Sequence, residues 1–273
     1  GQSFAGQTIF IYEEQGMGDT IQFLRYLPVV KQLGGSVIFE VVPPLLRLVQ
    51  GTQGYDRLWL GMKDIDTRPT DRLDYHIPLL SLPNVFKTTL ENVPNDIPYI
   101  KPDLDLVRIW KKRVRGDGQF KIGLVWSGHP DHTNDSNRSM KLSRFEPLLD
   151  LGGIEWFSLQ KDPQAKWTDI PVKQILIKDI GSEISDFADT AAIIENLDLI
   201  IAVDTAVVHL SGAMGKEVWT LLPFSPDWRW MLDRNDSPWY PTMKLFRQPN
   251  PGDWNSVIKL VLRELSERIQ KGW

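Results

Sequence analysis

Four mainly apolar segments in the second half of the chain constrain the fold most. They are residues 122–126, 154–159, 199–203 and 218–222. Strands that are apolar at successive positions are buried on both faces, which is typical of a parallel sheet covered by helices. Helical patterns separate these segments. The second half is therefore predicted to form an α/β unit around a parallel sheet.

The first half alternates short apolar runs with helical patterns in the same way. Its predicted strands are residues 8–12, 36–41, 57–60 and 74–77. Gly116-Asp117-Gly118 is the best linker candidate, because paired glycines favour loops. The sequence predicts two α/β units joined by one linker, followed by a last helix.

Composition narrows the class of protein. The chain has 273 residues, of which 42% are hydrophobic and 24% charged, as in an ordinary globular protein. A net charge of −4 and the lack of a basic block give no support for nucleic-acid binding. No apolar run is long enough to span a membrane. The chain contains no cysteine, which excludes disulfides and thiolate sites and fits a reducing compartment such as the cytoplasm.

A glycine-broken turn follows the first predicted strand. It reads Gln15-Gly16-Met17-Gly18-Asp19 and leads into a helical pattern. The glycines allow a sharp turn and a close approach of the backbone to a ligand. Asp19 then stands at the carboxyl end of a strand, where open α/β sheets bind ligands. From the residues alone, Asp19 is either a helix cap or a catalytic base.

Polar residues follow the strong strands of the second half at once. They are Ser127 and Gly128, Gln160 and Lys161, and Asp204 and Thr205. The carboxyl ends of parallel strands share one edge of the sheet, so these side chains should gather there. Asp204 and Thr205 open a helix whose free N–H groups suit a phosphate. The alternative is that Asp204 is only an N-cap.

The polar loop 129–141 follows the first of these strands. Arg138, Ser139 and Lys141 could hold a diphosphate through charge-assisted hydrogen bonds, and a solvated surface loop is the alternative. Its two histidines lack the spacing and the further ligands of a metal site, so no metal is expected. Trp228 and Arg229, in a proline-rich turn, could stack on a base or sugar or simply pack.

Taken together, these motifs resemble the glycosyltransferase-like domain that follows tetratricopeptide repeats in many bacterial proteins. That domain is related to the heptosyltransferases of glycosyltransferase family 9. The resemblance rests on residues 14–23, 123–128, 137–139, 158–161, 186–192, 203–210, 227–230, 237–242 and 245–248. These segments run in order through almost the whole chain, and their combination is specific although each alone is weak.

The resemblance implies a GT-B fold, in which two Rossmann-like domains face each other across a cleft. The N-terminal acceptor domain would span residues 1–115 and the nucleotide-sugar domain residues 119–250, with a helix at 251–273 returning to the N-terminal domain. Asp19 matches the proposed catalytic base of the family, in the loop with Gln15, Gly16 and Gly18. The implied phosphate-binding residues are Arg138, Ser139, Asp204, Thr205, Ala206 and His209, and those for the nucleotide and sugar are Ser127, Gly128, Gln160, Lys161, Trp228 and Arg229. The heptosyltransferases commonly have Lys where this chain has Arg138.

The predicted function is inverting transfer of a sugar from a nucleotide-sugar donor to a hydroxyl of an acceptor protein or glycan. No cofactor or metal is expected, because protein groups would neutralise the diphosphate. The resemblance also implies tetratricopeptide repeats upstream, and the start of the chain suggests an excised domain. A sugar-nucleotide epimerase and a non-catalytic nucleotide-sugar-binding module remain alternatives. A nicotinamide-dependent oxidoreductase is disfavoured, because no third glycine completes the dinucleotide motif after Gly18.

Overall fold

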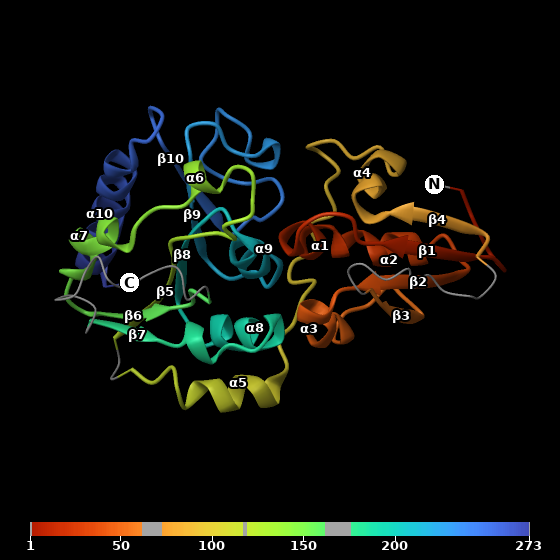
Figure 1. The fold of residues 1–273 in the computed structure, drawn as a ribbon, viewed down its shortest axis with the longest axis horizontal. Helices are drawn as coiled ribbons and strands as arrows, with labels where there is room; N and C mark the ends of the chain where they lie inside the picture. The colour runs from red at the N-terminus through yellow and green to blue at the C-terminus, as the bar shows by residue number, and fades with distance from the viewer. Residues whose placement is uncertain (1, 62–72, 117–118, 162–175, 273) are drawn as a thin grey trace.

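The computed structural model describes residues 2–61, 73–116, 119–161 and 176–272 (Figure 1). The predicted linker falls partly outside these residues, at Asp117 and Gly118. In the described part of the chain, the strands form two separate parallel sheets, as the sequence predicts. The smaller sheet lies in the N-terminal half and the larger one in the C-terminal half.

The smaller sheet has the strand order β3-β2-β1-β4. Its first strand, β1, therefore lies in the interior, and the turn that follows β1 starts from the middle of the sheet edge. The described strands of this sheet are β1 (Thr8–Tyr12), β2 (Ser36–Val41), β3 (Arg57–Leu60) and β4 (Tyr75–Pro78).

The larger sheet has the order β10-β9-β8-β5-β6-β7. All five residues of β8 and of β9 are buried, which agrees with the prediction of strands covered on both faces. The two edge strands escaped prediction, because their charged residues interrupt the apolar pattern. The strands are β5 (Phe120–Val125), β6 (Ile154–Ser158), β7 (Ile177–Asp179), β8 (Leu199–Val203), β9 (Val218–Leu222) and β10 (Met243–Arg247).

Helices cover both sheets. The first helical pattern breaks at a 3₁₀ turn, and Pro28 falls in the first turn of the next helix, where its missing N–H costs little. The α-helices are α1 (Met17–Phe23), α2 (Leu27–Lys31), α3 (Leu46–Gln50), α4 (Leu82–Val85), α5 (Leu104–Lys111), α6 (Asp135–Arg138), α7 (Glu146–Leu149), α8 (Phe187–Glu195), α9 (Ala206–Ala213) and α10 (Trp254–Lys271). The 3₁₀ turns are η1 (Leu24–Tyr26), η2 (Pro43–Leu45), η3 (Leu79–Ser81), η4 (Leu142–Phe145), η7 (Gly181–Glu183) and η8 (Trp228–Trp230).

The last helix corrects one expectation. α10 does not return to the N-terminal domain but packs on the larger sheet, far from the smaller one (Figure 1). Its buried stripe, which includes Val257, Val261 and Leu265, joins the core formed by β5, β8 and β9. Ion pairs between α10 and the sheet strengthen this placement: Lys244 of β10 reaches Glu264 at 2.6 Å. Burial of this apolar stripe against the face of the larger sheet stabilises α10 in this position.

Helix α5 corrects the predicted domain boundary. It precedes residue 115 but packs against α8 of the C-terminal half. The indole Nε1 of Trp110 donates to Asp189 Oδ1 at 3.2 Å, and Asn196 Nδ2 donates to the Val107 carbonyl at 3.1 Å. Burial of the α5 face against α8 therefore places this helix with the second unit.

The two halves are joined by a buried arginine. Arg25 is 4% exposed and lies in η1 of the N-terminal half. Its Nη1 donates to the carbonyls of Trp239, at 2.9 Å, and Pro94, at 3.0 Å, while Nη2 donates to the Tyr99 hydroxyl at 3.0 Å. The guanidinium also lies over the ring of Tyr240, 4.9 Å from its centroid. A single side chain thus binds segments of both halves.

Candidate active site

The turn after β1 places Asp19 in the first turn of α1. Gly16 is the N-cap residue, and its backbone N–H donates to Asp19 Oδ2 at 3.0 Å. This is the side-chain-to-backbone half of a capping box, so the capping role considered from the sequence is present. The hydrogen bond from Gly16 occupies Oδ2 of Asp19, and Oδ1 can bind a second partner.

Gly18 allows α1 to approach α9 closely. A Cβ atom at this position would lie 2.9 Å from His209 Cδ2 and 3.4 Å from Ala206 Cα. The contact with His209 is shorter than real Cβ atoms make, so a side chain at position 18 would force His209 or one of the two helices to shift. The approach brings the turn after β1 against the helix that follows β8.

The second oxygen of Asp19 is bound by an arginine from the other half of the molecule. Arg229 Nη2 donates to Asp19 Oδ1 at 2.5 Å, and Arg229 Nη1 lies 2.9 Å from Asp227 Oδ1. Arg229 is 7% exposed. Its Nε has no hydrogen-bond partner among the residues that the structure describes. The guanidinium therefore lies between two carboxylates at the junction of the two units.

Asp204 lies at the end of β8, beside the same arginine. Its Oδ2 accepts a hydrogen bond from Trp230 Nε1 at 2.9 Å. Burial raises the pKa of the Asp204 carboxyl, and the Trp230 hydrogen bond and the charges of Arg229 and Arg138 partly oppose that rise. Asp204 does not cap α9 through its side chain; the N-cap residue is Thr205. The N-cap reading of Asp204 is thus wrong.

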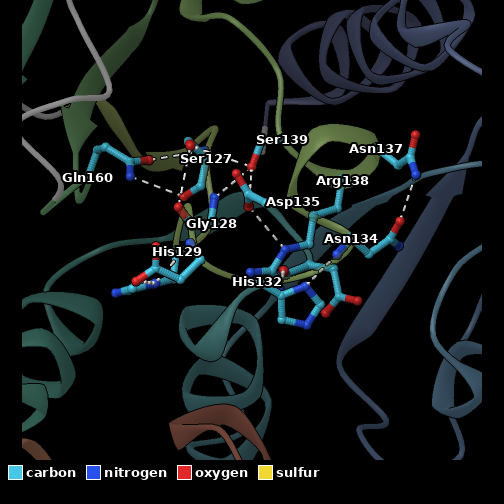
Figure 2. Close-up of polar contacts among 12 residues, drawn as sticks. Ser127, Gly128, His129, His132, Asn134, Asp135, Asn137, Arg138, Ser139 and Gln160 are labelled. Carbon is cyan, nitrogen blue, oxygen red and sulfur yellow. Dashed lines mark hydrogen bonds and ion pairs between the residues drawn. The ribbon is translucent and has the colours of Figure 1, made fainter.

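The loop after β5 holds Arg138 next to Asp204. Figure 2 shows Arg138 beside Asp135 of the same loop. Arg138 Nη1 donates to the Asp204 carbonyl at 2.9 Å, and its Nε donates to Asp135 Oδ1 at 3.3 Å. Gly128 makes room for this guanidinium, because a Cβ there would lie 2.5 Å from Arg138 Nη2. Arg138 is thereby fixed at the start of α9.

Ser139 and Gln160 hold the loop in shape. Ser139 Oγ donates to Asp135 Oδ1 at 2.8 Å and accepts from the Gly128 N–H at 2.8 Å. Gln160 Oε1 accepts from the Ser127 N–H at 3.1 Å, and Gln160 Nε2 donates to the Ser127 carbonyl at 3.0 Å. Figure 2 shows the contacts of Gln160 with Ser127 and of Ser139 with Asp135 and Gly128. Ser127, Gly128, Ser139 and Gln160 therefore form one network.

His209 of α9 is buried beside Trp230 and Tyr240. Its Nδ1 lies 2.9 Å from the Tyr240 hydroxyl, and its ring stacks on Trp230 with centroids 5.2 Å apart. Burial, helped by the charges of Arg229 and Arg25, lowers the pKa of His209 well below its ordinary value of 6.5. The imidazole is therefore neutral at pH 7 and supplies no positive charge to a phosphate.

The start of α9 carries an unsatisfied hydroxyl. Thr205 Oγ1 is buried and has no hydrogen-bond partner within the described parts of the chain. Ala206 begins the helix, and no side chain caps the first turn. Buried polar groups are nearly always paired, so this hydroxyl and the adjacent free N–H groups suit an anionic ligand.

Several predicted site residues lie apart from this group. Trp228 is 61% exposed, and its ring contacts Arg229, whose Cζ lies 5.1 Å from the centroid. Lys161 is also exposed, and its Nζ donates to the Ser185 carbonyl at 2.6 Å. Gln15 is exposed in the turn before Gly16. These three side chains do not join the network around Arg138.

Four residues of the site were missed as site residues. Asp227 and Trp230 flank the Arg229 that the sequence singled out, and Asp135 stands in the predicted loop. Tyr240 lies in a turn rich in proline and aromatic residues, 31 positions from the histidine that it binds. The visible signal was the cluster of Trp and Arg near residue 229, but the partner of each side chain depends on contacts distant in sequence.

The described residues contain neither a cluster of metal ligands nor a helix that could span a membrane. There, no group of three or more His, Asp or Glu side chains is placed to hold a metal ion. His129 and His132 instead accept hydrogen bonds from backbone N–H groups of their own loop, at 3.3 and 3.1 Å. No described helix is long and apolar enough to cross a membrane.

Comparison with solved structures defines the fold as that of the GT-B heptosyltransferases. The chain is similar to the glycosyl transferase family 9 protein of Veillonella parvula, with a TM-score of 0.71 and 12% identity over 99% of both chains. ADP-heptose lps heptosyltransferase II of E. coli gives a TM-score of 0.66 at 12% identity, over 97% of this chain and 99% of that one. E. coli heptosyltransferase WaaC with ADP gives 0.58 at 13% identity, over 98% of this chain and 100% of that one.

Among curated proteins, the chain is similar to Protein FlbA of Caulobacter vibrioides. The two are 26% identical over 294 residues, which cover 98% of this chain and 48% of FlbA. The chain thus spans about half the length of this relative. No protein-family model matches the chain.

Proposed function

We propose that this chain is an inverting glycosyltransferase that moves a sugar from a nucleotide-sugar donor to an acceptor hydroxyl. One observation carries the proposal: a carboxylate from the N-terminal unit, Asp19, meets cationic and helix-terminal groups of the C-terminal unit. In a fold of the heptosyltransferase type, Asp19 would then be the base, and the groups facing it on the C-terminal unit would bind the leaving diphosphate. Fold alone does not determine function, so the proposal rests on the site.

The donor diphosphate binds at the start of α9 in this proposal. Arg138 stands 2.9 Å from the Asp204 carbonyl, at the helix start. Thr205 Oγ1 has no hydrogen-bond partner among the residues that the structure describes, and no side chain there caps the first turn of α9, so a phosphate oxygen could bind at this place. Fixed donors of this kind stabilise the charge that develops on a departing diphosphate. Neither a metal nor an organic cofactor is part of the proposal.

The other residues predicted to bind the donor have supporting roles, outside direct contact with the diphosphate. Ser127, Gly128, Ser139 and Gln160 shape the loop that carries Arg138. His209 acts as a neutral group behind the helix start. Trp228 and Lys161 lie at the exposed margin, where the nucleotide base or sugar would extend.

Asp19 acts as the general base and takes the proton of the acceptor hydroxyl as that oxygen attacks the anomeric carbon. Attack opposite the leaving diphosphate inverts the anomeric centre. The Asp19–Arg229 ion pair adds a requirement, because one oxygen of Asp19 caps α1 and the other is bound by Arg229. We propose that Arg229 turns from Asp19 to the donor diphosphate, which frees the carboxylate when the donor is bound.

The nucleotide and acceptor are proposed from relatives. One solved structure of similar fold contains ADP and another contains ADP-2-deoxy-2-fluoro heptose, so ADP is the first nucleotide to test. The match to half of FlbA is compatible with a longer protein in which tetratricopeptide repeats precede this domain and present a protein acceptor. The lack of cysteine and the use of a nucleotide sugar favour the cytoplasm.

The decisive experiment screens UDP-, GDP-, ADP- and CMP-sugars for thermal stabilisation and for release of the nucleotide with and without acceptor. A transferase releases nucleotide in proportion to glycosylated acceptor. An epimerase changes the sugar without a net acceptor product. A binding module is stabilised by the nucleotide sugar and releases nothing.

A further inference from the structure

A cavity of about 490 Å³ lies at the carboxyl edge of the larger sheet, beside the proposed diphosphate site. Three segments enclose it: the end of the loop that follows β5, the turn after β9, and the turn between β10 and α10. Ser139 belongs both to this cavity and to the network around Arg138, whereas Asp19, Asp204 and Arg229 do not line it. The cavity is thus a neighbour of the proposed active site and not a part of it.

The charge of the lining favours an anion. Lys141 and Arg144 line the cavity, and no Asp or Glu does so among the described residues. Arg144 Nη1 donates to Asn255 Oδ1 at 2.5 Å. An amide is a neutral partner, so this contact does not neutralise the positive charge of the guanidinium. Two cations in a concave surface attract a negatively charged group.

The other lining groups fit a sugar ring. Phe224 is 47% exposed, and Trp254 lies in the first turn of α10. Ser136, Asn137 and Ser225 add hydroxyl and amide groups. A sugar ring presents C–H groups to an aromatic face and hydroxyl groups to polar side chains. The volume lies within the range of about 300–1,000 Å³ that small-molecule sites occupy.

Gln248 gives the cavity a fixed shape and a free donor. The side chain is 3% exposed, and its Oε1 accepts from the N–H groups of Phe224, at 3.2 Å, and Gly252, at 2.9 Å. These bonds tie the turn after β9 to the turn after β10. Gln248 Nε2 has no hydrogen-bond partner among the residues described. A ligand oxygen at this position would satisfy a buried donor.

We propose that this cavity binds an anionic saccharide, that is, a sugar ring that carries a carboxylate or a phosphate. Lys141 and Arg144 bind the anionic group, Phe224 contacts the ring, and Gln248 binds a ring oxygen. Its place in sugar transfer, as a site for part of the acceptor or product, rests on the proposed function. Binding itself does not depend on that function.

The test is calorimetric titration of the full 273-residue chain with glucuronate, glucose 6-phosphate, glucose and inorganic phosphate. A charge-assisted contact predicts that at least one of the two anionic sugars binds about tenfold tighter than glucose. Glucose 6-phosphate should also bind tighter than inorganic phosphate. The two anionic sugars separate a carboxylate site from a phosphate site, and tight binding of either one supports the proposal.

Two variants locate the binding. Lys141→Gln and Phe224→Ala alter exposed side chains and should each weaken the binding of the preferred anionic sugar about tenfold. Lys111→Gln on α5 and Tyr75→Ala on β4 are matched controls on other elements and should leave it unchanged. Equal affinity for all four probes, or binding that survives both cavity variants, would overturn the proposal.

Titration with ADP separates this proposal from the proposed function. ADP should bind the Phe224→Ala variant as it binds the wild type, and ADP and the anionic sugar should bind together. Mutual exclusion of the two at saturating concentration would show that the cavity is no separate site. If the wild type did not bind ADP, the proposed function would be contradicted. The sugar titration would still test the cavity, because it does not depend on ADP.

Discussion

Arg229 donates to Asp19 Oδ1 across 2.5 Å and thereby joins the turn after β1 to the loop after β9. These segments belong to different sheets and lie 210 positions apart in the sequence. The Arg229 guanidinium neutralises the charge of Asp19, and a diphosphate can compete with Asp19 for the same guanidinium. The pair therefore connects donor binding to the availability of the proposed base.

Asp19→Asn tests the base. The amide keeps an oxygen that can accept from the Gly16 N–H, but it cannot take a proton from the acceptor. Transfer should fall by about 10²–10⁴-fold, the usual contribution of a positioned base, while nucleotide affinity stays nearly unchanged. Single-turnover rates and nucleotide titration measure the two effects. Transfer at the wild-type rate would rule out the assignment.

Arg229→Gln tests the proposed exchange of partners. The variant removes a charge-assisted donor to the diphosphate and should weaken ADP binding about tenfold. Asp19→Asn is the matched comparison, because it breaks the same ion pair from the other side and should not weaken ADP binding. Equal effects of the two variants on ADP affinity would show that Arg229 acts only as a structural partner of Asp19.

Gly128→Ala tests the position of Arg138. The added methyl group would lie 2.5 Å from Arg138 Nη2 and 2.7 Å from Asp135 Oδ1, so the guanidinium has to move. We expect a higher KM for the donor with a nearly unchanged melting temperature, since the arginine and the loop are only partly buried. An unchanged KM would separate Arg138 from donor binding.

Gly18→Ala tests the contact between α1 and α9. Its Cβ would lie 2.9 Å from His209 Cδ2, and overpacking of this kind typically costs about 1–3 kcal/mol. Gly152→Ala is the matched control, because no atom lies within 4 Å of its added Cβ, and it should change stability by less than about 0.5 kcal/mol. Denaturant unfolding measures both. Equal stability of the two variants would contradict a tight helix contact.

The pH dependence of stability tests the state of His209. The folded protein holds this imidazole neutral, because burial lowers its pKa well below 6.5. As pH falls through about 6.5, the unfolded chain takes up a proton that the folded chain does not, so stability should decrease. His209→Gln should show a flatter dependence between pH 7.5 and about 5.5. The same slope in both proteins would contradict a neutral buried histidine.

The interior strands were predictable, and the long-range partners were not. Continuous apolar runs identified β5, β6, β8 and β9, because burial on both faces leaves a direct trace in the sequence. Edge strands β7 and β10 contain charged residues that interrupt the apolar pattern, so their sequence resembles a loop. The placement of α10 was wrong because it was taken from the family resemblance, whereas in this chain the apolar stripe of the helix packs on the larger sheet.

The candidate site shows the same division. The glycine turn and the residues after the strands marked where polar groups gather, because the carboxyl edge of a parallel sheet collects them. No pattern linked Asp19 to Arg229, because that pair forms only where the two units dock. Nor did any pattern link His209 to Tyr240, because that contact joins two distant segments of the C-terminal unit. The role of Gly128 was equally invisible, because it depends on the path of the Arg138 side chain.

Arg25 has a consequence for movement between the two units. Its guanidinium donates to the Trp239 carbonyl of the C-terminal unit and lies over the Tyr240 ring. It also donates to the Pro94 carbonyl and the Tyr99 hydroxyl, in the segment between the two sheets. A separation of the units at this point would strip a buried charge of its partners. Arg25 therefore opposes separation of the two units, at a place distinct from the Asp19–Arg229 pair.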